Sequence, residues 1–174
     1  SAGDLAFSDR YRAPRMLTTE ETQQMVGKFE AAFRRALQAG VDTIEIHGAH
    51  GYLIHQFHSP VTNQRSDEYG KDKARFGVEI IQAARKIMPE SMPLIMRISA
   101  VEYGEGGYDL EYMLDLVKKY KEAGVDMFHV SSGGDSTAGP KQPGPGYQVD
   151  LASEIKKAIG LPVIAVGRLE DPHL

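Results

Sequence analysis

The sequence predicts an α/β fold in which four parallel strands alternate with helices. Four short apolar or β-branched runs each follow a segment with apolar residues at helical spacing. A short repeat supports the same unit, because Gln-Ala-Gly-Val-Asp at 38–42 returns as Glu-Ala-Gly-Val-Asp at 122–126, each where a helix gives way to a strand. Alternating helices and strands favour a parallel sheet.

The order of polar and apolar residues within the strands favours a barrel over an open sheet. In the first strand the polar Glu45 and His47 share one face, and two isoleucines take the other. The next two strands repeat this pattern, with Arg97 and His129 at polar positions. An open sheet covered on both sides needs two apolar faces. We therefore expect a partial TIM (β/α)8 barrel of four parallel βα units, about half of the eight that a whole barrel has.

The individual elements follow from border residues and periodicity. Residues 1–17 are polar and irregular and predict an arm, and we expect all of 1–174 to form a single domain. Thr18 and Glu21 form a capping box that starts the first helix, and Gly40 ends it before the strand at 41–46. The other predicted elements are a helical turn at 53–57, a long loop at 59–72, helices at 74–88, 109–123 and 149–159, and strands at 94–99, 125–131 and 162–167.

Composition argues against several classes of partner. The 174 residues carry a net charge of -4 without a basic block, which does not favour nucleic acid. There is no cysteine, which excludes disulfides and suits a reducing compartment. No apolar run approaches the roughly 20 residues that span a bilayer, and the first residues lack signal-peptide character. These features predict a cytoplasmic protein with neither a nucleic-acid nor a membrane partner.

A glycine-rich loop after the first strand holds the strongest candidates for chemistry. His47, His50 and Tyr52 lie within six positions, where the carboxyl end of a parallel strand often carries a site. Gly48 and Gly51 allow the backbone to turn tightly there. Imidazole and phenol groups can all donate hydrogen bonds, and a phenol can also protonate a substrate carbon.

Two other interpretations of these residues remain open from the spacing alone. One histidine could be structural and the other a surface residue, with Tyr52 packed at the base of the loop. Alternatively, His55 or His58 could join His47 and His50 as a third zinc ligand, although no fourth ligand is evident. We expect no metal site.

A long segment then identifies a family. His-Gly-Ala-His-Gly-Tyr-Leu-Ile-His-Gln-Phe at 47–57 and Ser-Pro-Val-Thr-Asn-Gln-Arg-Ser-Asp-Glu-Tyr-Gly at 59–70 resemble the flavin-dependent old yellow enzyme family. The resemblance is strongest to its bacterial NADPH dehydrogenase (ene-reductase) branch with two histidines. The sequence departs from it after residue 70, where the family has a longer Gly-Ser-rich insert. The resemblance implies that this chain contains strands four to seven of the barrel and is the middle-to-late part of a longer enzyme.

The resemblance also implies a reaction and a role for each residue. NADPH would reduce FMN, and the reduced flavin would pass hydride to the activated C=C of an α,β-unsaturated carbonyl substrate. His47 and His50 would bind the substrate and donate hydrogen bonds to its carbonyl oxygen, a catalytic role of the oxyanion-hole type. Tyr52, also at the substrate, would give a proton to the α-carbon.

Two further places are expected to contact the cofactor. Arg97 lies in an apolar strand, where an unpaired charge is costly, so we expect an ion pair with Glu45. The resemblance places the same arginine at the N1/O2 edge of FMN. It also assigns Gly167 and Arg168, at the end of the last strand, to part of the FMN phosphate site, a place where such barrels often bind phosphate.

Two alternatives to the enzyme assignment are kept. The chain could be a non-catalytic half-barrel that associates with itself, because its two sheet edges can pair with another copy. Two such halves would supply the eight strands of a closed barrel, so a homo-oligomer is expected. The chain could also belong to another FMN barrel dehydrogenase, such as one similar to dihydroorotate dehydrogenase.

Overall fold

The computed structural model describes residues 1–171 and 173, and its centre is one parallel sheet of four strands. The strands are β1 (Ile44–Gly48), β2 (Leu94–Ser99), β3 (Met127–Ser131) and β4 (Val163–Ala165). They lie side by side in the order β1-β2-β3-β4, and every pairing is parallel. Each strand therefore neighbours the next in sequence, as in the wall of a (β/α)8 barrel. This confirms the predicted fold class.

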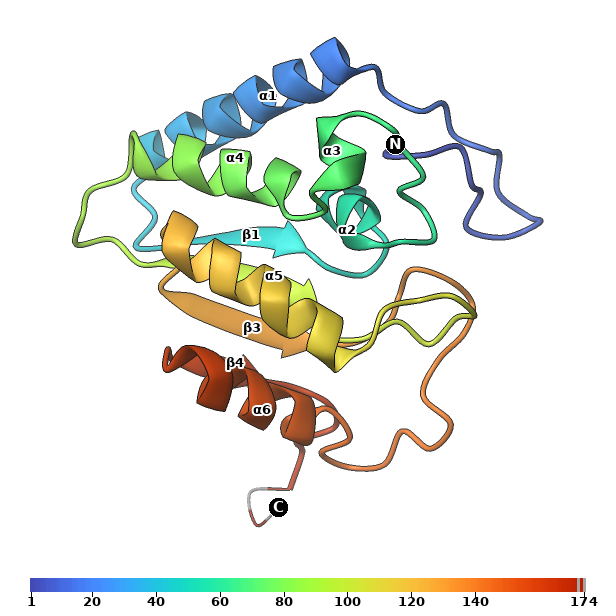
Figure 1. Ribbon diagram of the computed structural model, residues 1–174. Helices are drawn as coiled ribbons and strands as arrows, with labels where there is room; N and C mark the ends of the chain where they lie inside the picture. Colours follow the sequence, from blue (N-terminus) through green and yellow to red (C-terminus); the bar gives the residue numbers. More distant parts are fainter. Residues whose placement is uncertain (172, 174) are drawn as a thin grey trace.

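Helices cover one face of this sheet. They are α1 (Thr19–Gln38), α2 (Leu53–His58), α3 (Glu68–Lys71), α4 (Arg75–Arg85), α5 (Leu110–Ala123) and α6 (Val149–Ile159). Figure 1 shows α4, α5 and α6 in a row over the strands, with α1 packed outside α4. No helix among residues 1–171 and 173 is both long and apolar enough to cross a membrane.

The predicted division of the strands into two faces is confirmed. In β1 the isoleucines Ile44 and Ile46 are buried, whereas Glu45 and His47 are exposed. The apolar face packs under the helices and forms the core. Its largest fully buried side chains include Leu94, Met96, Ile98 and Phe128 from the strands and Phe76, Ile80, Ile81, Met113 and Tyr120 from the helices. The polar side chains are left on the other face, where the site lies.

The first helix begins as its residues predict. The Thr18 hydroxyl oxygen accepts a hydrogen bond from the Glu21 backbone N–H at 3.1 Å, and the Glu21 carboxylate accepts one from the Thr18 N–H at 2.8 Å. This capping box satisfies two amides that a helix start leaves without partners.

The predicted long loop at 59–72 instead contains the short helix α3. Asp67 caps this helix by accepting hydrogen bonds from the backbone N–H groups of Tyr69 and Gly70. The Arg65 guanidinium, 4% exposed, donates to the Asp67 carboxylate from Nε at 3.0 Å. The Asp67 cap and the buried Arg65 thus order a stretch whose polar composition predicts no regular structure.

Strand and helix ends shift by a few residues from the predicted ones. The first strand begins at Ile44 instead of Val41, whose side chain is exposed, and the last strand is only three residues long. The helix predicted to reach residue 88 ends at Arg85. The arm at 1–17 lacks helix and strand, as predicted, and is tied to α2 by the Ser1 hydroxyl, 2.9 Å from Gln56 Oε1.

Candidate functional site

The structure brings the three predicted loop residues together at the carboxyl end of β1. The ring centroids of His47 and His50 are 5.3 Å apart in a T-shaped arrangement, and the Tyr52 ring is 5.1 Å from that of His47. Tyr52 is 62% exposed and His47 is exposed, so both are accessible to a ligand. Two exposed side chains, those of His47 and Tyr52, and the half-buried His50 thus form one cluster that a ligand can approach from solvent.

The side chains of the loop come together because its backbone bends at two residues with positive φ angles. Residues three apart on a straight strand would face opposite sides, but His50 has φ +57° and Gly51 φ +74°. A Cβ at Gly51 would lie 2.6 Å from the carbonyl oxygen of Gly134, so only glycine fits beneath the loop that follows β3. A non-glycine residue in the left-handed region, as at His50, is a feature that gathers at functional sites.

His50 is the more strongly held of the two histidines. Its Nε2 lies 2.8 Å from the Ser131 hydroxyl at the end of β3, and its backbone N–H donates to the Ser99 hydroxyl at 3.2 Å. Burial, followed by the positive charge of Arg97, lowers the pKa of His50 to about 4. The same causes lower the pKa of His47 below its ordinary value. Both imidazoles are therefore neutral at pH 7.

The prediction of an ion pair between Glu45 and Arg97 is wrong, although the two residues do share the polar face. The Glu45 carboxylate instead accepts a hydrogen bond from His129 Nδ1 at 2.8 Å. Since β2 lies between their strands, the contact between the two side chains spans that strand. The His129 imidazole is thus the hydrogen-bond partner of the Glu45 carboxylate, and the Arg97 guanidinium does not pair with that carboxylate.

Arg97 consequently carries an unmet hydrogen-bond donor. Its Nε is buried without a partner, and among the described residues no carboxylate lies within ion-pair distance of its guanidinium. A buried charge without a partner is costly, so such a group fits a site for an electron-rich ligand. The N1/O2 edge of a flavin has this character, since negative charge gathers there on reduction. The residues on this face therefore fit the predicted cofactor.

Gly167 and Arg168 follow β4 after one intervening residue, and the chain adopts positive φ angles of +114° and +55° there. The Arg168 side chain is more than half exposed and donates to the carbonyl oxygen of Pro143 at 2.9 Å. Its Nε is also 3.7 Å from the Glu170 carboxylate. The guanidinium is thus engaged by its own loops and would have to leave these contacts to bind a phosphate.

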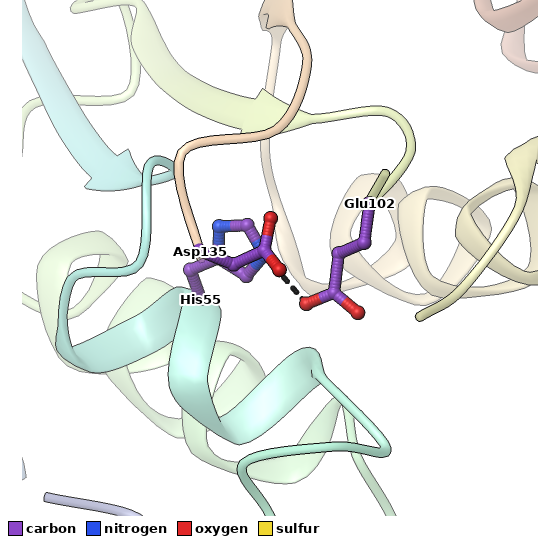
Figure 2. Close-up of side chains that lie close together, drawn as sticks. All are labelled: His55, Glu102 and Asp135. Atoms are coloured by element: carbon purple, nitrogen blue, oxygen red, sulfur yellow. Dashed lines mark hydrogen bonds and ion pairs between the residues drawn. The ribbon is translucent and has the colours of Figure 1, made fainter. Parts of the chain in front are cut away.

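A buried cluster beneath the loop, formed by His55, Glu102, Tyr108 and Asp135, is not evident from the sequence. The Gly51 N–H donates to His55 Nδ1 at 3.1 Å, so the ring proton lies on Nε2, which donates to Glu102 Oε1 at 3.0 Å (Figure 2). The Tyr108 hydroxyl oxygen is 3.1 Å from the same nitrogen. The four residues come from α2, from the loop between β2 and α5, and from the loop after β3, so only their proximity in space reveals the cluster.

Asp135 completes this cluster. Burial and the negative charge of Glu102 raise its pKa. Within the described residues, His55, Glu102 and Asp135 form the one group of His, Asp and Glu side chains spaced for a metal ion. Because His55 Nε2 carries the ring proton, it has no lone pair to offer a metal. The cluster instead anchors the loop through Gly51. The zinc alternative is also weakened, since His58 Nε2 pairs with the Tyr120 hydroxyl at 2.7 Å.

The parallel sheet with a polar face and a histidine–tyrosine loop at the end of β1 has the arrangement that the resemblance to a class of flavin oxidoreductases predicts. Residues 3–174 match the NADH:flavin oxidoreductase / NADH oxidase family, and the chain belongs to it. This confirms the predicted resemblance and, with it, the family's flavin cofactor, FMN.

Relatives by sequence agree with this assignment. The chain is 42% identical over 174 residues to an NADPH dehydrogenase of Clostridium acetobutylicum, covering 98% of this chain and 51% of the relative. It is 43% identical over 167 residues to an NADH oxidase of Thermoanaerobacter brockii, covering 92% of this chain and 26% of the relative. The chain thus spans about half or less of the curated relatives that it matches.

Solved structures show the same fold. A 2-naphthoyl-CoA reductase in complex with 2-naphthoyl-CoA superposes with a TM-score of 0.88 at 29% identity, over 99% of this chain and 27% of that one. An old yellow enzyme homologue from Zymomonas mobilis superposes with a TM-score of 0.73 at 25% identity, over 90% of this chain and 44% of that one. The four βα units therefore correspond to part of a larger architecture.

Proposed function

We propose that this protein is an FMN-dependent oxidoreductase of the ene-reductase type. In this proposal NADPH is the reductant, and hydride passes from the reduced flavin to the activated C=C of an α,β-unsaturated carbonyl compound. The observation that carries the proposal is the cluster of His47, His50 and Tyr52 at the end of β1, in a chain of a flavin oxidoreductase family.

The two imidazoles hold the substrate through its carbonyl oxygen. Negative charge grows on this oxygen as hydride arrives at the β-carbon, so hydrogen bonds to the oxygen stabilise the transition state more than the ground state. His47 and His50 are neutral, which suits hydrogen bonding without proton transfer. The positive charge of Arg97, which acts on both rings, favours the same build-up of negative charge.

Tyr52 acts as the general acid. A phenol hydroxyl can give its proton to the α-carbon while hydride is delivered to the β-carbon. Its exposure and its position beside His47 support this role, because a substrate held by the histidines would reach the phenol from the open side.

The cofactor contacts are proposed from this chain's own residues. Arg97 would hold FMN through its unpaired Nε, on the polar face of the sheet. Gly167 and Arg168 would hold the phosphate, after Arg168 has left Pro143. FMN, when bound, supplies the hydride that the reaction transfers.

The proposal is tested on protein expressed from its whole natural reading frame. We expect a yellow protein with the visible absorbance of bound flavin, bleached anaerobically by NADPH. Cyclohex-2-enone should then restore the oxidised spectrum, while saturated cyclohexanone should not. A protein that retains flavin but is reoxidised only by oxygen would contradict the ene-reductase proposal.

A second candidate is a half-barrel that associates with itself without catalysis. The observation in its favour is that, among residues 1–171 and 173, β1 and β4 each pair on one side only, which leaves two open edges. Light scattering and a visible spectrum of the isolated 174-residue chain separate the candidates. A dimer or larger species without flavin favours association, and a flavin-bound monomer contradicts it. A cytoplasmic location stays a prediction from the sequence.

A further inference from the structure

Side chains of α2 hold Gly51, the residue between His50 and Tyr52, at both of its peptide groups. The Gly51 N–H donates to His55 Nδ1 at 3.1 Å, and the Gly51 carbonyl oxygen accepts from Gln56 Nε2 at 2.8 Å. Gly51 has a φ of +74°, and the Tyr52 side chain that follows is exposed. The direction in which the Tyr52 side chain leaves the loop therefore depends on how the Gly51 backbone is held.

The donor and acceptor roles of the His55 ring follow from Gly51. A backbone N–H can only donate, so His55 Nδ1 accepts, and the single proton of the neutral ring lies on Nε2. Nε2 donates this proton to Glu102 Oε1 at 3.0 Å. The Tyr108 hydroxyl, 3.1 Å from the same nitrogen, gives its own proton to the carbonyl oxygen of Ser99 at 2.8 Å. Towards His55 this hydroxyl can only accept, so both neighbours of Nε2 require a proton there.

Glu102 accepts a hydrogen bond at each of its carboxylate oxygens. Its Oε1 accepts from His55, and its Oε2 accepts from the backbone N–H of Tyr108 at 3.2 Å. The side chains of His55 and Glu102 are both 0% exposed, so these contacts are shielded from solvent. The chain of hydrogen bonds thus begins and ends at a backbone donor, at Gly51 and at Tyr108. Its middle group must accept at two separate atoms, which a carboxylate does, whereas a carboxamide has only one acceptor atom.

We propose that Glu102 is a positioning residue: it holds His55 in the tautomer that accepts from Gly51, and thereby fixes the loop that carries the proposed active residues. These are His50 and Tyr52, on either side of Gly51. With the proton held on Nε2, the lone pair of Nδ1 stays directed at the Gly51 N–H. The placement of the loop is a property of the protein alone, and its effect on alkene reduction rests on the proposed function.

The first test needs no substrate and uses the protein expressed from its whole natural reading frame. Long-range ¹H–¹⁵N correlation spectra at pH 7 report the ring proton of His55, and hydrogen exchange reports the Gly51 amide. We expect a single His55 tautomer, protonated at Nε2, and a protected Gly51 amide. Glu102→Gln offers one acceptor atom to two donors. It should mix the tautomers and speed Gly51 exchange by at least about fivefold, the factor that one net hydrogen bond provides.

Two substitutions of His55 separate the two sides of its ring. An asparagine places its amide oxygen near the position of Nδ1 and can still accept from Gly51. A glutamine reaches the position of Nε2 and leaves the Gly51 N–H without an acceptor. We expect His55→Asn to keep the Gly51 amide protected and His55→Gln to lose the protection. The same exchange measurement compares them, and equal exchange in the two variants would overturn the proposed contact.

The control is His58→Gln, at the other fully buried histidine of α2, whose Nε2 lies 2.7 Å from the Tyr120 hydroxyl. It should lower stability without changing the His55 tautomer or Gly51 exchange. If Glu102→Gln fails to fold, Glu102→Asp, whose carboxylate is one methylene group shorter, weakens the same contacts and gives the same comparison. A wild-type His55 ring protonated at Nδ1, Gly51 exchange that is unchanged by substitution of Glu102, or an equal change in His58→Gln would overturn the proposal.

The second test follows the half-reactions of the flavin-loaded protein. Misplacement of a reacting group by about 1 Å can lower a rate by about 10²-fold. Glu102→Gln should therefore slow reoxidation by cyclohex-2-enone at least about tenfold more than it slows flavin reduction by NADPH. His58→Gln should not separate the two steps. Equal losses in Glu102→Gln would make Glu102 merely structural. A wild-type protein that does not reduce the enone would contradict the proposed function, whereas the exchange data decide the placement of the loop independently.

Discussion

The carboxylate of Glu45 on β1 lies 2.8 Å from Nδ1 of His129 on β3, across the intervening strand β2. The pair lies on the polar face that the sequence pattern predicts, and it takes the carboxylate away from Arg97. The positive charge beside the histidine loop is thereby left for a ligand. This contact connects a detail of strand pairing to the chemistry that the site can support.

Removing this carboxylate should destabilise the fold measurably. Glu45→Ala leaves the largely buried His129 without its acceptor, and we expect a loss of about 1–3 kcal/mol in the free energy of unfolding. Urea denaturation measures this loss. Glu30→Ala, which removes an exposed pair with Arg34 on α1, is the matched control and should cost no more than about 0.5 kcal/mol. Equal losses would show that the Glu45–His129 contact contributes nothing specific.

Tyr52→Phe should separate the two half-reactions of the flavin-loaded protein. The phenol is 62% exposed, so its hydroxyl contributes little to folding. Loss of a general acid lowers rates by about 10²–10⁴-fold, and we expect this decrease only in alkene reduction. Stopped-flow absorbance should show flavin reduction by NADPH at the wild-type rate. A parallel decrease in both steps would mean that Tyr52 has no role as proton donor.

Substitution of the histidines should affect ligand binding more than flavin retention. His47→Ala removes an exposed imidazole, and His50→Asn keeps a residue type that tolerates the positive φ of this position. We expect each to weaken the binding of a phenolic or enone ligand by up to about 3 kcal/mol. Spectral titration of the bound flavin measures this. Unchanged titrations in both variants, with normal flavin content, would remove the histidines from the site.

The pair between Asp67 and Arg65 should make stability depend on pH in acid. The Arg65 guanidinium, with further hydrogen bonds, lowers the pKa of Asp67 from its ordinary 3.8 to about 2. A lowered carboxyl pKa adds stability above pH 4, and this part is lost as the pH falls from about 4 to about 2.

Asp67→Asn should cost about 2 kcal/mol at pH 7, the usual size for hydrogen bonds to a charged group. Chemical denaturation at a series of pH values should show the difference from wild type shrinking towards pH 2. Asp115→Asn, from an exposed pair with Lys118, serves as the control and should change little at any pH. A difference that stays constant down to pH 2 would exclude the ionised Asp67 as its origin.

The sequence predicts which face each strand residue occupies, but not which partner it meets there. Alternation along β1 places Glu45 correctly, because the period of a strand is two. The choice of His129 over Arg97 depends on side-chain reach between residues 84 positions apart. Periodicity contains no information on such distances.

The site is predictable to a similar degree. His47, His50 and Tyr52 lie close in sequence, and glycines mark the bend that joins them. The residues that hold this loop are hidden for a different reason. Ser131 is a small residue of a common type, and Glu102 follows a strand by only three positions. Their importance depends on burial and on hydrogen bonds from distant elements, which appear only in three dimensions.

The contrast between exposed reactive groups and a buried frame has a consequence for how such a protein changes over generations. Tyr52 and His47 can be replaced at small folding cost, whereas Glu102, Ser99 and Ser131 are enclosed and bonded on several sides. Substitutions at residues 47 and 52 can therefore change the substrate preference while the protein stays folded. A library varied at residues 47 and 52 should keep most members folded, and one varied at 99, 102 and 131 should lose most of them.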